Sequence, residues 1–303
     1  MIPTDSIIST ERNVRRTLTG AIVRLEAENV PSAPLAAELL LMHVLRRDRA
    51  FLYAHPEFVL DEKQAAHFFQ LIAQRAAGTP VQYLTGHQEF WGLDFEVNQS
   101  VLIPRPETEH VVEVALARID DHRADPLMVG DAGTGSGCLA VALASELPNA
   151  HFLATDISRP ALEVARRNAE RHGFVVRIEF RRANFLRTYL SDSQPVKRCF
   201  DLIVSNPPYI GLNEATSLPR EVREHEPHDA LFAGPEGHEA YPRLIEQAAT
   251  LMRTGGWLVL ELAHLSAPRV EPLLQAPVWQ DVAIERDLAG MDRVISAKRA
   301  PRA

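Results

Sequence analysis

Asn206-Pro207-Pro208-Tyr209 is the stretch of this sequence whose residue types are best suited to chemistry. It directly follows residues 200–205, a short apolar run typical of a strand inside a parallel sheet. Two prolines cannot continue a strand, so the chain leaves the sheet at Asn206 with a stiff backbone. The turn then holds a side-chain amide, free carbonyl groups and an aromatic ring in fixed relation. This set suits a planar substrate whose NH2 hydrogens the acceptors bind.

A second candidate site is the glycine-rich run Asp131-Ala132-Gly133-Thr134-Gly135-Ser136-Gly137. It follows a predicted strand at 127–130 and opens a helix that runs through Leu147. Glycines at alternate positions let the backbone turn tightly and pass close to a ligand. Asp156 ends the next predicted strand, where its carboxylate can accept hydrogen bonds from two ribose hydroxyls. The two features together predict a nucleotide-like cofactor.

Two cofactor classes fit this pattern. Gly135-x-Gly137-x-x-Ala140, with an acid about twenty residues on, also satisfies the dinucleotide fingerprint, which would make the protein an NAD-dependent oxidoreductase. A pyrophosphate would lie poorly beside Asp131, whereas the ammonium of S-adenosylmethionine would lie well there. The turn at Asn206 has no role in hydride transfer, but it explains methyl transfer to an amine or amide. The sequence therefore favours methyl transfer.

The first eighty or so residues, which precede both sites, are predicted to be helical. Residues 4–28 carry apolar side chains at helical spacing. Ser32 can cap a second helix that runs through residue 44, and Asp61 a third, which Gly78 closes. Residues 81–104 are instead aromatic and β-branched, which predicts a short hairpin linking two domains.

Apolar strands and helices alternate along the rest of the chain. The predicted strands are 127–130, 152–155, 175–180, 200–205 and 257–262, and helices are predicted at 158–172 and 240–252. This alternation predicts a parallel sheet covered on both faces, completed by a C-terminal helix and hairpin. Ligands of such sheets bind at the carboxyl ends of strands. We therefore expect Asp131, Asp156 and Asn206 around one pocket.

Composition limits the class of protein. The chain has 303 residues, a net charge of -8 and a pI near 5.9, which argues against affinity built on phosphate neutralisation. It has two cysteines, no signal-peptide pattern and no apolar run of bilayer length. His225-x-x-His228 has metal-like spacing, but Pro227 interrupts the helix that would align it. We expect a cytoplasmic monomer with no metal, no membrane contact and no direct nucleic-acid binding.

Motifs along nearly the whole chain resemble one enzyme family, the release factor glutamine methyltransferases (PrmC/HemK) of class I. Besides the glycine turn and Asn206 to Tyr209, they are Gly-Thr-Pro-x-x-Tyr-Leu-Thr-Gly at 78–86, Glu-Phe-Trp-Gly-Leu at 89–93, Val-Leu-Ile-Pro-Arg-Pro-Glu-Thr-Glu at 101–109, Glu-Pro-x-x-Ala-Leu at 226–231 and Asp-Leu-Ala-Gly-x-Asp-Arg at 287–293. The 105–109 run separates this family from the related enzymes that methylate a glutamine of a ribosomal protein.

The resemblance implies a fold, a reaction and a partner. The fold is α/β: a Rossmann-like, mostly parallel seven-stranded sheet in residues 105–303, a helical substrate-recognition domain in 1–80 and a hairpin linker in 81–104. The reaction is transfer of a methyl group from S-adenosyl-L-methionine, with S-adenosyl-L-homocysteine as product. Its substrate is the N5 amide of the glutamine in the Gly-Gly-Gln motif of peptide-chain release factors, and the modification tunes translation termination.

The resemblance also implies site residues. Its cofactor contacts fall on Gly133, Thr134, Gly135, Ser136, Gly137 and Asp156, and its substrate and catalytic clamp on Asn206, Pro207, Pro208 and Tyr209. To the cofactor contacts we add Asp131, facing the ammonium, and Asn206. Asn184 is added because this chain reads Arg-Ala-Asn-Phe at 182–185, where many members have an acid that contacts adenine.

Residues of the clamp are predicted to make different contacts with the substrate amide. Asn206 Oδ1 and the Pro207 carbonyl accept the two amide hydrogens, and Tyr209 packs on the amide plane. The mouth of the pocket or the surface that meets the partner is expected to be shaped by Arg105, Glu107 and Glu109. The alternative is that Pro106 and Glu107 merely start a helix. Phe90 and Trp91 are expected in the hairpin core.

Other functions stay open from the residues alone. An amino-methyltransferase acting on adenine in nucleic acid shares Asn-Pro-Pro-Tyr and would flip its base into the same clamp. Methylation of a ribosomal-protein glutamine and a non-catalytic partner of the translation machinery are further alternatives.

Overall fold

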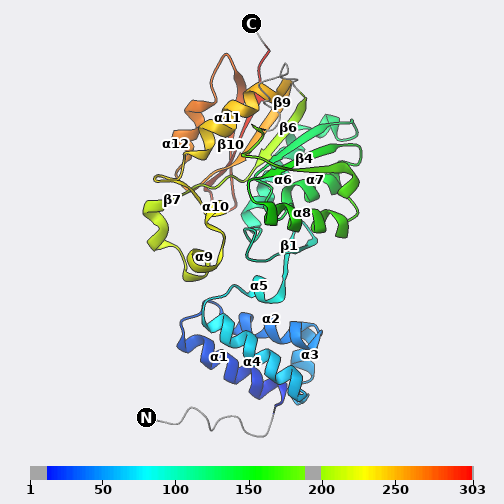
Figure 1. Cartoon of the computed structure of the whole chain (residues 1–303), viewed down its shortest axis with the longest axis vertical. Helices are drawn as coiled ribbons and strands as arrows, with labels where there is room; N and C mark the ends of the chain where they lie inside the picture. Colours follow the sequence, from blue (N-terminus) through cyan, green and yellow to red (C-terminus); the bar gives the residue numbers. More distant parts are fainter. Residues whose placement is uncertain (1–11, 188–198, 302–303) are drawn as a thin grey trace. The chain divides into compact units, whose positions relative to one another are not determined.

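The computed structural model describes residues 12–187 and 199–301. The first residues of the helix predicted from residue 4 lie outside these ranges. Contacts within the chain divide it into two units, drawn in Figure 1. One contains the residues up to Gly86 together with Arg220–His225, and the other contains His87–Pro219 and the residues from Glu226 onward.

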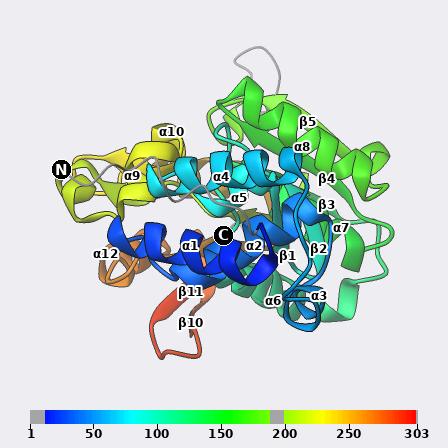
Figure 2. The same ribbon diagram turned by 90° about the horizontal axis from the view of Figure 1, so that it is seen from below.

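The first unit is helical. Its helices are α1 (Val14–Ala27), α2 (Ala33–Leu45), α3 (Arg49–Ala54), α4 (Glu62–Ala76), α5 (Val81–Thr85) and α9 (Arg220–His225). Helices α1, α2 and α4 pack side by side around a core that includes Leu25, Leu40 and Phe68 (Figures 1 and 2). Arg75 of α4 forms an ion pair with Glu221 of α9 at 2.6 Å. All three predicted helices are present, but the first begins at Val14, so the described residues 12 and 13 of its predicted range are not helical. Helices α3 and α5 were not predicted, and α5 occupies the start of the 81–104 stretch that was predicted as a hairpin.

Helix capping in this unit follows the sequence in one place and departs from it in another. Asp61 caps α4 as predicted, because its carboxylate accepts a hydrogen bond from the Gln64 N–H at 2.8 Å. The prediction that the Ser32 side chain caps α2 was wrong: Ser32 precedes the helix in a left-handed conformation, and its hydroxyl makes no capping bond. Pro34 in the first turn has no N–H, so this helix start has one donor fewer to satisfy.

The second unit begins with the predicted hairpin. Strands β1 (His87–Phe90) and β2 (Leu93–Glu96) are antiparallel and joined by Trp91 and Gly92. Both turn residues have positive φ, 55° and 68°, as a type I′ turn requires. Phe90 is buried in the core, and the Trp91 indole donates to Glu146 Oε1 at 2.9 Å.

A seven-stranded sheet forms the centre of the second unit. Its strands are β3 (Met128–Ala132), β4 (His151–Asp156), β5 (Ile178–Arg182), β6 (Phe200–Ser205), β9 (Met252–Glu261), β10 (Trp279–Arg286) and β11 (Asp292–Arg299). Their order is β10-β11-β9-β6-β3-β4-β5. The strands from β9 to β5 are parallel neighbours, and β11 is antiparallel to both β9 and β10. The predicted mostly parallel seven-stranded fold is confirmed.

Helices cover both faces of this sheet. On one face lie α6 (Glu109–Arg118), α7 (Cys138–Glu146) and α8 (Arg159–Arg171), and on the other lie α11 (Ala240–Leu251) and α12 (Ala267–Val270) (Figure 1). Two apolar clusters fill the two interfaces. Val112 and Leu143 belong to the first cluster, and Leu244 and Ile295 to the second. The near-continuous apolar strands of the sequence follow from this double burial.

Shorter elements complete the second unit. They are α10 (His228–Leu231), the strand pair β7 (Ile210–Gly211) and β8 (Phe232–Gly234), and 3-10 turns at Pro106–Thr108, Asp120–His122, Val175–Arg177, Leu212–Ser217 and Glu271–Leu273. The strand predicted at 175–180 was wrong in its first half, because Val175–Arg177 forms a 3-10 turn. The Arg177 guanidinium donates to the Ala144 and Leu147 carbonyls at 2.5 and 2.7 Å, so the strand begins only at Ile178.

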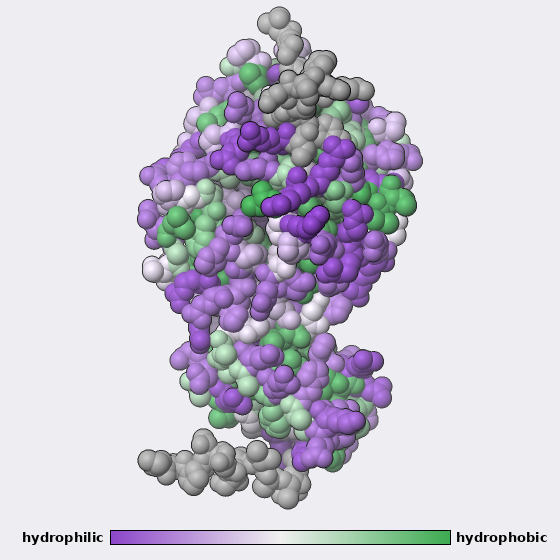
Figure 3. Space-filling model, in the orientation of Figure 1, coloured by the Kyte–Doolittle hydropathy of each residue, from purple (hydrophilic) through white to green (hydrophobic). Residues whose placement is uncertain are grey.

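The surface is polar over most of the face shown in Figure 3, where apolar side chains form separate small areas. Within residues 12–187 and 199–301, none of the helices has the length and apolar character needed to cross a bilayer.

Candidate active site

A cavity of about 290 Å³ opens in the second unit where strands β3, β4, β5 and β6 end. The residues that follow these strands line it, namely Gly133 to Ser136, Asp156 to Ser158, Ala183 to Phe185, Asn206 and Pro208. The segment before α6 also contributes, through Ser100, Val101, Leu102, Pro104, Arg105 and Thr108. Asp156 and Asn206 therefore share one cavity. Asp131 does not line it.

The three glycines of the turn have different environments. All have positive φ, 82° at Gly133, 54° at Gly135 and 83° at Gly137. Apart from the adjacent residues in the chain, no atom of the described residues lies within 4 Å of the place where a Cβ would stand at Gly133 or Gly135, and both glycines line the cavity. A Cβ at Gly137 would lie 3.1 Å from Ala165 Cβ. The first two glycines thus leave room for a ligand, whereas Gly137 lets the start of α7 approach α8.

Asp131 holds the glycine turn from inside the protein. Its Oδ2 accepts hydrogen bonds from Thr134 Oγ1 at 2.6 Å and from the Ala140 N–H at 3.2 Å. Oδ1 is buried, and none of the described residues forms a hydrogen bond with it. Burial raises the pKa of this carboxyl to about 7, against the opposing effect of the two hydrogen bonds. The acid joins the turn to the first residues of α7.

Asp156 joins the same turn to the next helix. Its Oδ2 accepts from the Gly135 N–H at 2.9 Å, and its Oδ1 from the Ser158 N–H at 2.8 Å. Burial raises the pKa of this carboxyl. Each carboxylate oxygen still has a second lone pair, so the side chain can also accept from hydroxyls of a ligand in the cavity.

Asn206 is held by a chain of hydrogen bonds between side chains. Its Nδ2 donates to Thr108 Oγ1 at 3.0 Å, and the Thr108 hydroxyl donates to Glu261 Oε2 at 2.7 Å. Tyr209 Oη donates to Glu261 Oε1 at 3.0 Å. With Nδ2 engaged in this way, Oδ1 is the amide atom that remains to accept hydrogen bonds in the cavity.

The residues after Asn206 are placed differently from one another. Pro208 lines the cavity, and Pro207 is buried. Tyr209 does not line it: the ring packs against the core cluster around α11. Burial raises the pKa of the Tyr209 phenol, and the adjacent Glu261 carboxylate acts in the same direction, so the hydroxyl stays neutral and serves as a donor.

The Arg105 segment both lines the cavity and starts a helix. The Arg105 guanidinium forms an ion pair with Glu226 Oε1, while Glu226 Oε2 accepts from the Ile103 N–H at 3.4 Å. Pro106 and Glu107 begin a 3-10 turn, and Glu109 accepts from the Trp91 N–H at 2.8 Å. Arg105 therefore joins two cavity-lining segments, 100–105 and 227–233.

Asn184, after β5, lines the cavity together with Arg243 of α11. The Arg243 guanidinium donates to Asn184 Oδ1 at 3.4 Å. This contact leaves the Asn184 NH2 group as a donor in a place where many family members were expected to offer a carboxylate acceptor.

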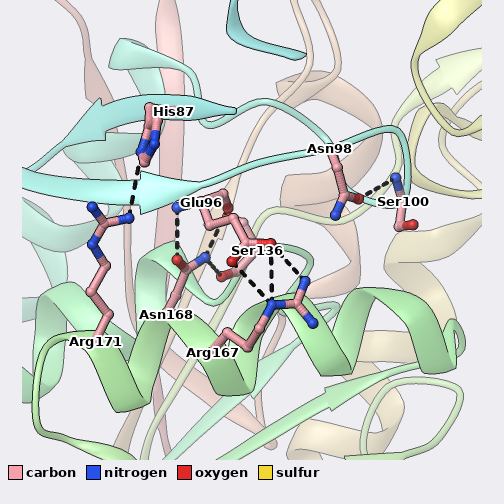
Figure 4. A network of polar contacts seen from close by, with 8 residues as sticks. All are labelled: His87, Glu96, Asn98, Ser100, Ser136, Arg167, Asn168 and Arg171. Atoms are coloured by element: carbon pink, nitrogen blue, oxygen red, sulfur yellow. Dashed lines mark hydrogen bonds and ion pairs between the residues drawn. The ribbon is translucent and has the colours of Figure 1, made fainter. Parts of the chain in front are cut away.

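The sequence analysis missed Asn168, a fully buried residue of α8. Its Nδ2 donates to the Glu96 and Ser136 carbonyls at 3.0 and 2.9 Å, and its Oδ1 accepts from the Glu96 N–H at 2.7 Å (Figure 4). Arg167 also binds the Glu96 carboxylate, at 2.7 Å. Asn168 thus ties the end of the hairpin to the glycine turn. A possible signal was an asparagine among the apolar positions of an amphipathic helix.

Other contributors were also missed. Thr108 and Glu261 are separated by 153 positions along the sequence, so no local pattern pairs them. His225 ends α9 and His228 begins α10, so the metal-like spacing is divided between two helices. Among the residues described in the structure, no three His, Cys, Asp or Glu side chains gather as metal ligands.

Comparison with known proteins adds independent information. A model of the PrmC N-terminal domain matches residues 16–86, and a methyltransferase domain model matches residues 125–271. The release factor glutamine methyltransferase of Koribacter versatilis is 41% identical over 286 residues, which cover 94% of this chain and 98% of the relative. The enzyme of that name from Nitratidesulfovibrio vulgaris is 42% identical, over 91% of this chain and 92% of its own.

Solved structures are similar in fold. The catalytic domain of hMettl16, solved with the MAT2A 3′UTR hairpin 6, aligns with a TM-score of 0.54 at 16% identity, over 80% of this chain and 85% of that chain. The N-terminal domain of human METTL16 in complex with SAH aligns with a TM-score of 0.51 at 17% identity, over 84% and 90%. At such identities the likeness shows the fold alone. The relatives that match over nearly their full length show more: this chain belongs to the release factor glutamine methyltransferase family.

Proposed function

We propose that this protein transfers a methyl group from S-adenosyl-L-methionine to the N5 amide of the glutamine in the Gly-Gly-Gln motif of peptide-chain release factors. The observation that carries this proposal is the full-length similarity to enzymes of that name, combined with an Asn206 side chain and a glycine turn that line the same cavity. The reaction would take place in the cytoplasm, with the protein as a monomer. The helical residues 1–80 would recognise the release factor, and residues 81–104 would link them to a methyltransferase domain in 105–303.

The cavity has the features that this cofactor requires. Gly133 and Gly135 leave open space for close approach, and Asp156 offers acceptors for the ribose hydroxyls. Thr134 and Ser136 also line the cavity, and Asn184 with Arg243 would meet the adenine edge. When bound, S-adenosylmethionine would supply an electrophilic methyl group on a sulfonium; the substrate amide would gain that methyl group and give one proton to water, and the cofactor would be left as a neutral thioether.

Asp131 has a different part in this proposal from the one its place in the sequence suggested. Its carboxylate is fully buried under the turn and does not line the cavity, so it would act on the cofactor through the turn it holds. Gly137 likewise contributes by packing. Direct contact with the cofactor is assigned to Gly133, Thr134, Gly135, Ser136 and Asp156, and to Asn184 at the adenine.

The substrate amide needs positioning more than it needs a base. A primary amide nitrogen is a weak nucleophile, because its lone pair is delocalised into the carbonyl. Asn206 Oδ1 and the Pro207 carbonyl would accept its two hydrogens, which raises electron density on nitrogen and aims it. Pro208 would bound the site, and Tyr209 would support it through its bond to Glu261. Holding such near-attack geometry contributes on the order of 7–11 kcal/mol to a reaction of this kind.

Mass spectrometry of a purified release factor tests the proposal directly. The protein is incubated with S-adenosylmethionine and release factor, and the peptide with the Gly-Gly-Gln motif is sequenced; we expect one added methyl group, on the glutamine. Parallel reactions with DNA, RNA and ribosomal protein use methyl-labelled cofactor. Transfer to one of these substrates, with the release factor left unmodified, would contradict the proposal.

A further inference from the structure

Glu261 is a buried acid beside Asn206, and the proposed reaction uses it only as the acceptor that supports Tyr209. It ends β9, which pairs in parallel with β6 so that Leu260 lies opposite Ser205. The residues that come next along the chain are therefore Glu261, the last residue of β9, and Asn206, the first residue after β6. Glu261 is only 1% exposed. Thr108 reaches the pair from the 3-10 turn that precedes α6.

The hydrogen bonds of this group have a fixed direction. Glu261 accepts from two hydroxyls, Thr108 on Oε2 and Tyr209 on Oε1. A hydroxyl has a single hydrogen, so Thr108 can only accept from Asn206 once that hydrogen is given to Glu261. The Asn206 group facing Thr108 at 3.0 Å must then be the NH2 group. Oδ1 takes the opposite side of the amide.

The two hydroxyl groups that contact Glu261 favour its accepting role. Burial raises the pKa of this carboxyl above its ordinary value, and the Glu107 carboxylate acts in the same direction, whereas the Thr108 and Tyr209 hydroxyls and the Arg293 guanidinium oppose the rise. Asp287 holds that guanidinium with a contact of 2.9 Å. Two hydroxyl donors and a nearby cation are the surroundings that a buried carboxylate requires.

From this geometry we propose that Glu261 is a positioning residue for methyl transfer: through the Thr108 hydroxyl it holds Asn206 with Oδ1 toward the substrate. The inference rests on the proposed function, in which Oδ1 accepts a hydrogen of the substrate NH2 group. If the amide turned by half a rotation, its own NH2 group would face the NH2 group of the substrate, and two donors would meet. The arrangement therefore acts on the chemical step and leaves cofactor binding unaffected.

Thr108 provides a matched test. Thr108→Val keeps the shape of the side chain and removes the hydroxyl, whereas Thr108→Ser keeps the hydroxyl. With full-length release factor as substrate, we expect T108V to lower kcat about tenfold or more and T108S to stay within about threefold of the unsubstituted protein. The calorimetric Kd for S-adenosylmethionine should not change in either variant. Thr250→Val in α11 makes the same chemical change away from the cavity and should leave kcat unaltered.

Glu261→Gln tests the other end of the chain of bonds. Its NH2 group can donate to Thr108, which reverses the direction of the bonds, so we expect kcat to fall about tenfold while the cofactor Kd holds. The E261Q/T108V double variant should have a kcat no lower than that of the slower single variant, because both changes break the same relay, the chain of hydrogen bonds from Glu261 through Thr108 to Asn206.

Several results would overturn the proposal. One is an unchanged kcat in T108V and E261Q while the unsubstituted protein methylates release factor. That result would contradict the role of Glu261 but not the proposed function. Another is an equal loss of kcat in T108V and T108S, which would indicate a packing effect. A loss of kcat that follows a loss of affinity for S-adenosylmethionine would also contradict the proposal. If T108V binds no cofactor, Thr108→Ala is compared with T108S, and equal kcat in that pair decides against the relay. Absence of methylation by the unsubstituted protein removes the proposed function and this inference with it.

Discussion

At the scale of single residues, Asn206 has the most direct role in the proposed reaction. Replacing it with alanine removes an acceptor that the substrate amide meets in the transition state. We expect Asn206→Ala to keep its affinity for S-adenosylmethionine and to lower turnover at least about a hundredfold. Calorimetry and steady-state methyl transfer measure the two quantities. Asn149→Ala is a suitable control, because that amide lies on the surface and donates to the Ala124 carbonyl. Near-normal methylation by N206A would remove the assigned role.

Asp131 gives a prediction for stability against pH. Its pKa rises from an ordinary 3.8 to about 7 in the folded protein. Below the lower value the carboxyl is neutral in both folded and unfolded chains. Between the two values only the unfolded chain ionises, so this residue reduces stability progressively as pH rises from about 4 to about 7. The full effect is on the order of 4 kcal/mol.

Asp131→Asn should remove that slope. The asparagine carbonyl can still accept from Thr134 and Ala140, and it does not ionise. Urea denaturation at several pH values between 4 and 8 should show the stability of D131N rising relative to that of the unsubstituted protein as pH increases. Parallel curves across this range would mean that Asp131 titrates at its ordinary pKa.

Some residue roles could be predicted from sequence and others could not. The position of Asn206 beside the cavity was predicted because a strand followed by two prolines must end at that residue, and ligands bind at the carboxyl ends of parallel strands. Asp131 was predicted at the correct strand end, but local pattern does not tell whether a carboxylate faces the cavity or the protein interior. Thr108, Glu261 and Asn168 were missed because their contacts join segments distant in sequence.

At the scale of elements, the glycine turn separates packing from ligand approach. A side chain at Gly137 would meet the α8 backbone 3.2 Å away at Ala165 Cα, while one at Gly133 would meet open space. Both positions have positive φ near 82°, so an alanine carries a similar backbone strain at each. Only Gly137→Ala adds a clash.

We therefore expect G137A to unfold more easily than G133A, by about 1–3 kcal/mol. Urea denaturation of the two variants without cofactor measures the difference, and the backbone term cancels in the comparison. Equal stabilities would show that the α7–α8 contact adapts to a methyl group.

Long elements were predicted better than short ones. Strands β3, β4, β6 and β9 are evident in the sequence as continuous apolar runs. Helices α8 and α11 are evident from apolar residues at helical spacing. Elements such as α3, α5 and β7 span two to six residues and are stabilised by what they pack against. The 3-10 turn at Val175–Arg177 looked like strand because its valines are β-branched, yet Arg177 holds the turn through distant carbonyls.

At the scale of the whole molecule, the choice between cofactors is open to a simple measurement. A ligand that binds only the folded protein raises its free energy of unfolding by about 2.7 kcal/mol at a hundredfold excess over Kd. S-adenosylmethionine should raise the Tm accordingly, and NADH should not. In Gly133→Val the side chain would project into the open space beside the turn, and the shift should largely disappear. A Tm shift with NADH and none with S-adenosylmethionine would contradict the proposed cofactor.

Strand order is the part of the fold that the sequence pattern leaves open. Alternation of strands and helices predicted a parallel sheet, and a terminal hairpin was expected. That β11, the last strand, inserts between β9 and β10 depends on pairing across the sheet. This pairing is decided by long-range contacts that hydropathy along the chain does not report.

Asn168 has a consequence for how this enzyme would respond to random mutation. The Asn168 carboxamide joins the strand that leads into residues 100–105 to the bend that carries Ser136, although Asn168 is not among the residues that line the cavity. A substitution there would loosen two walls of the reaction chamber at once. A mutational survey confined to cavity-facing side chains would overlook it, whereas a survey of the whole gene should find position 168 among the most sensitive.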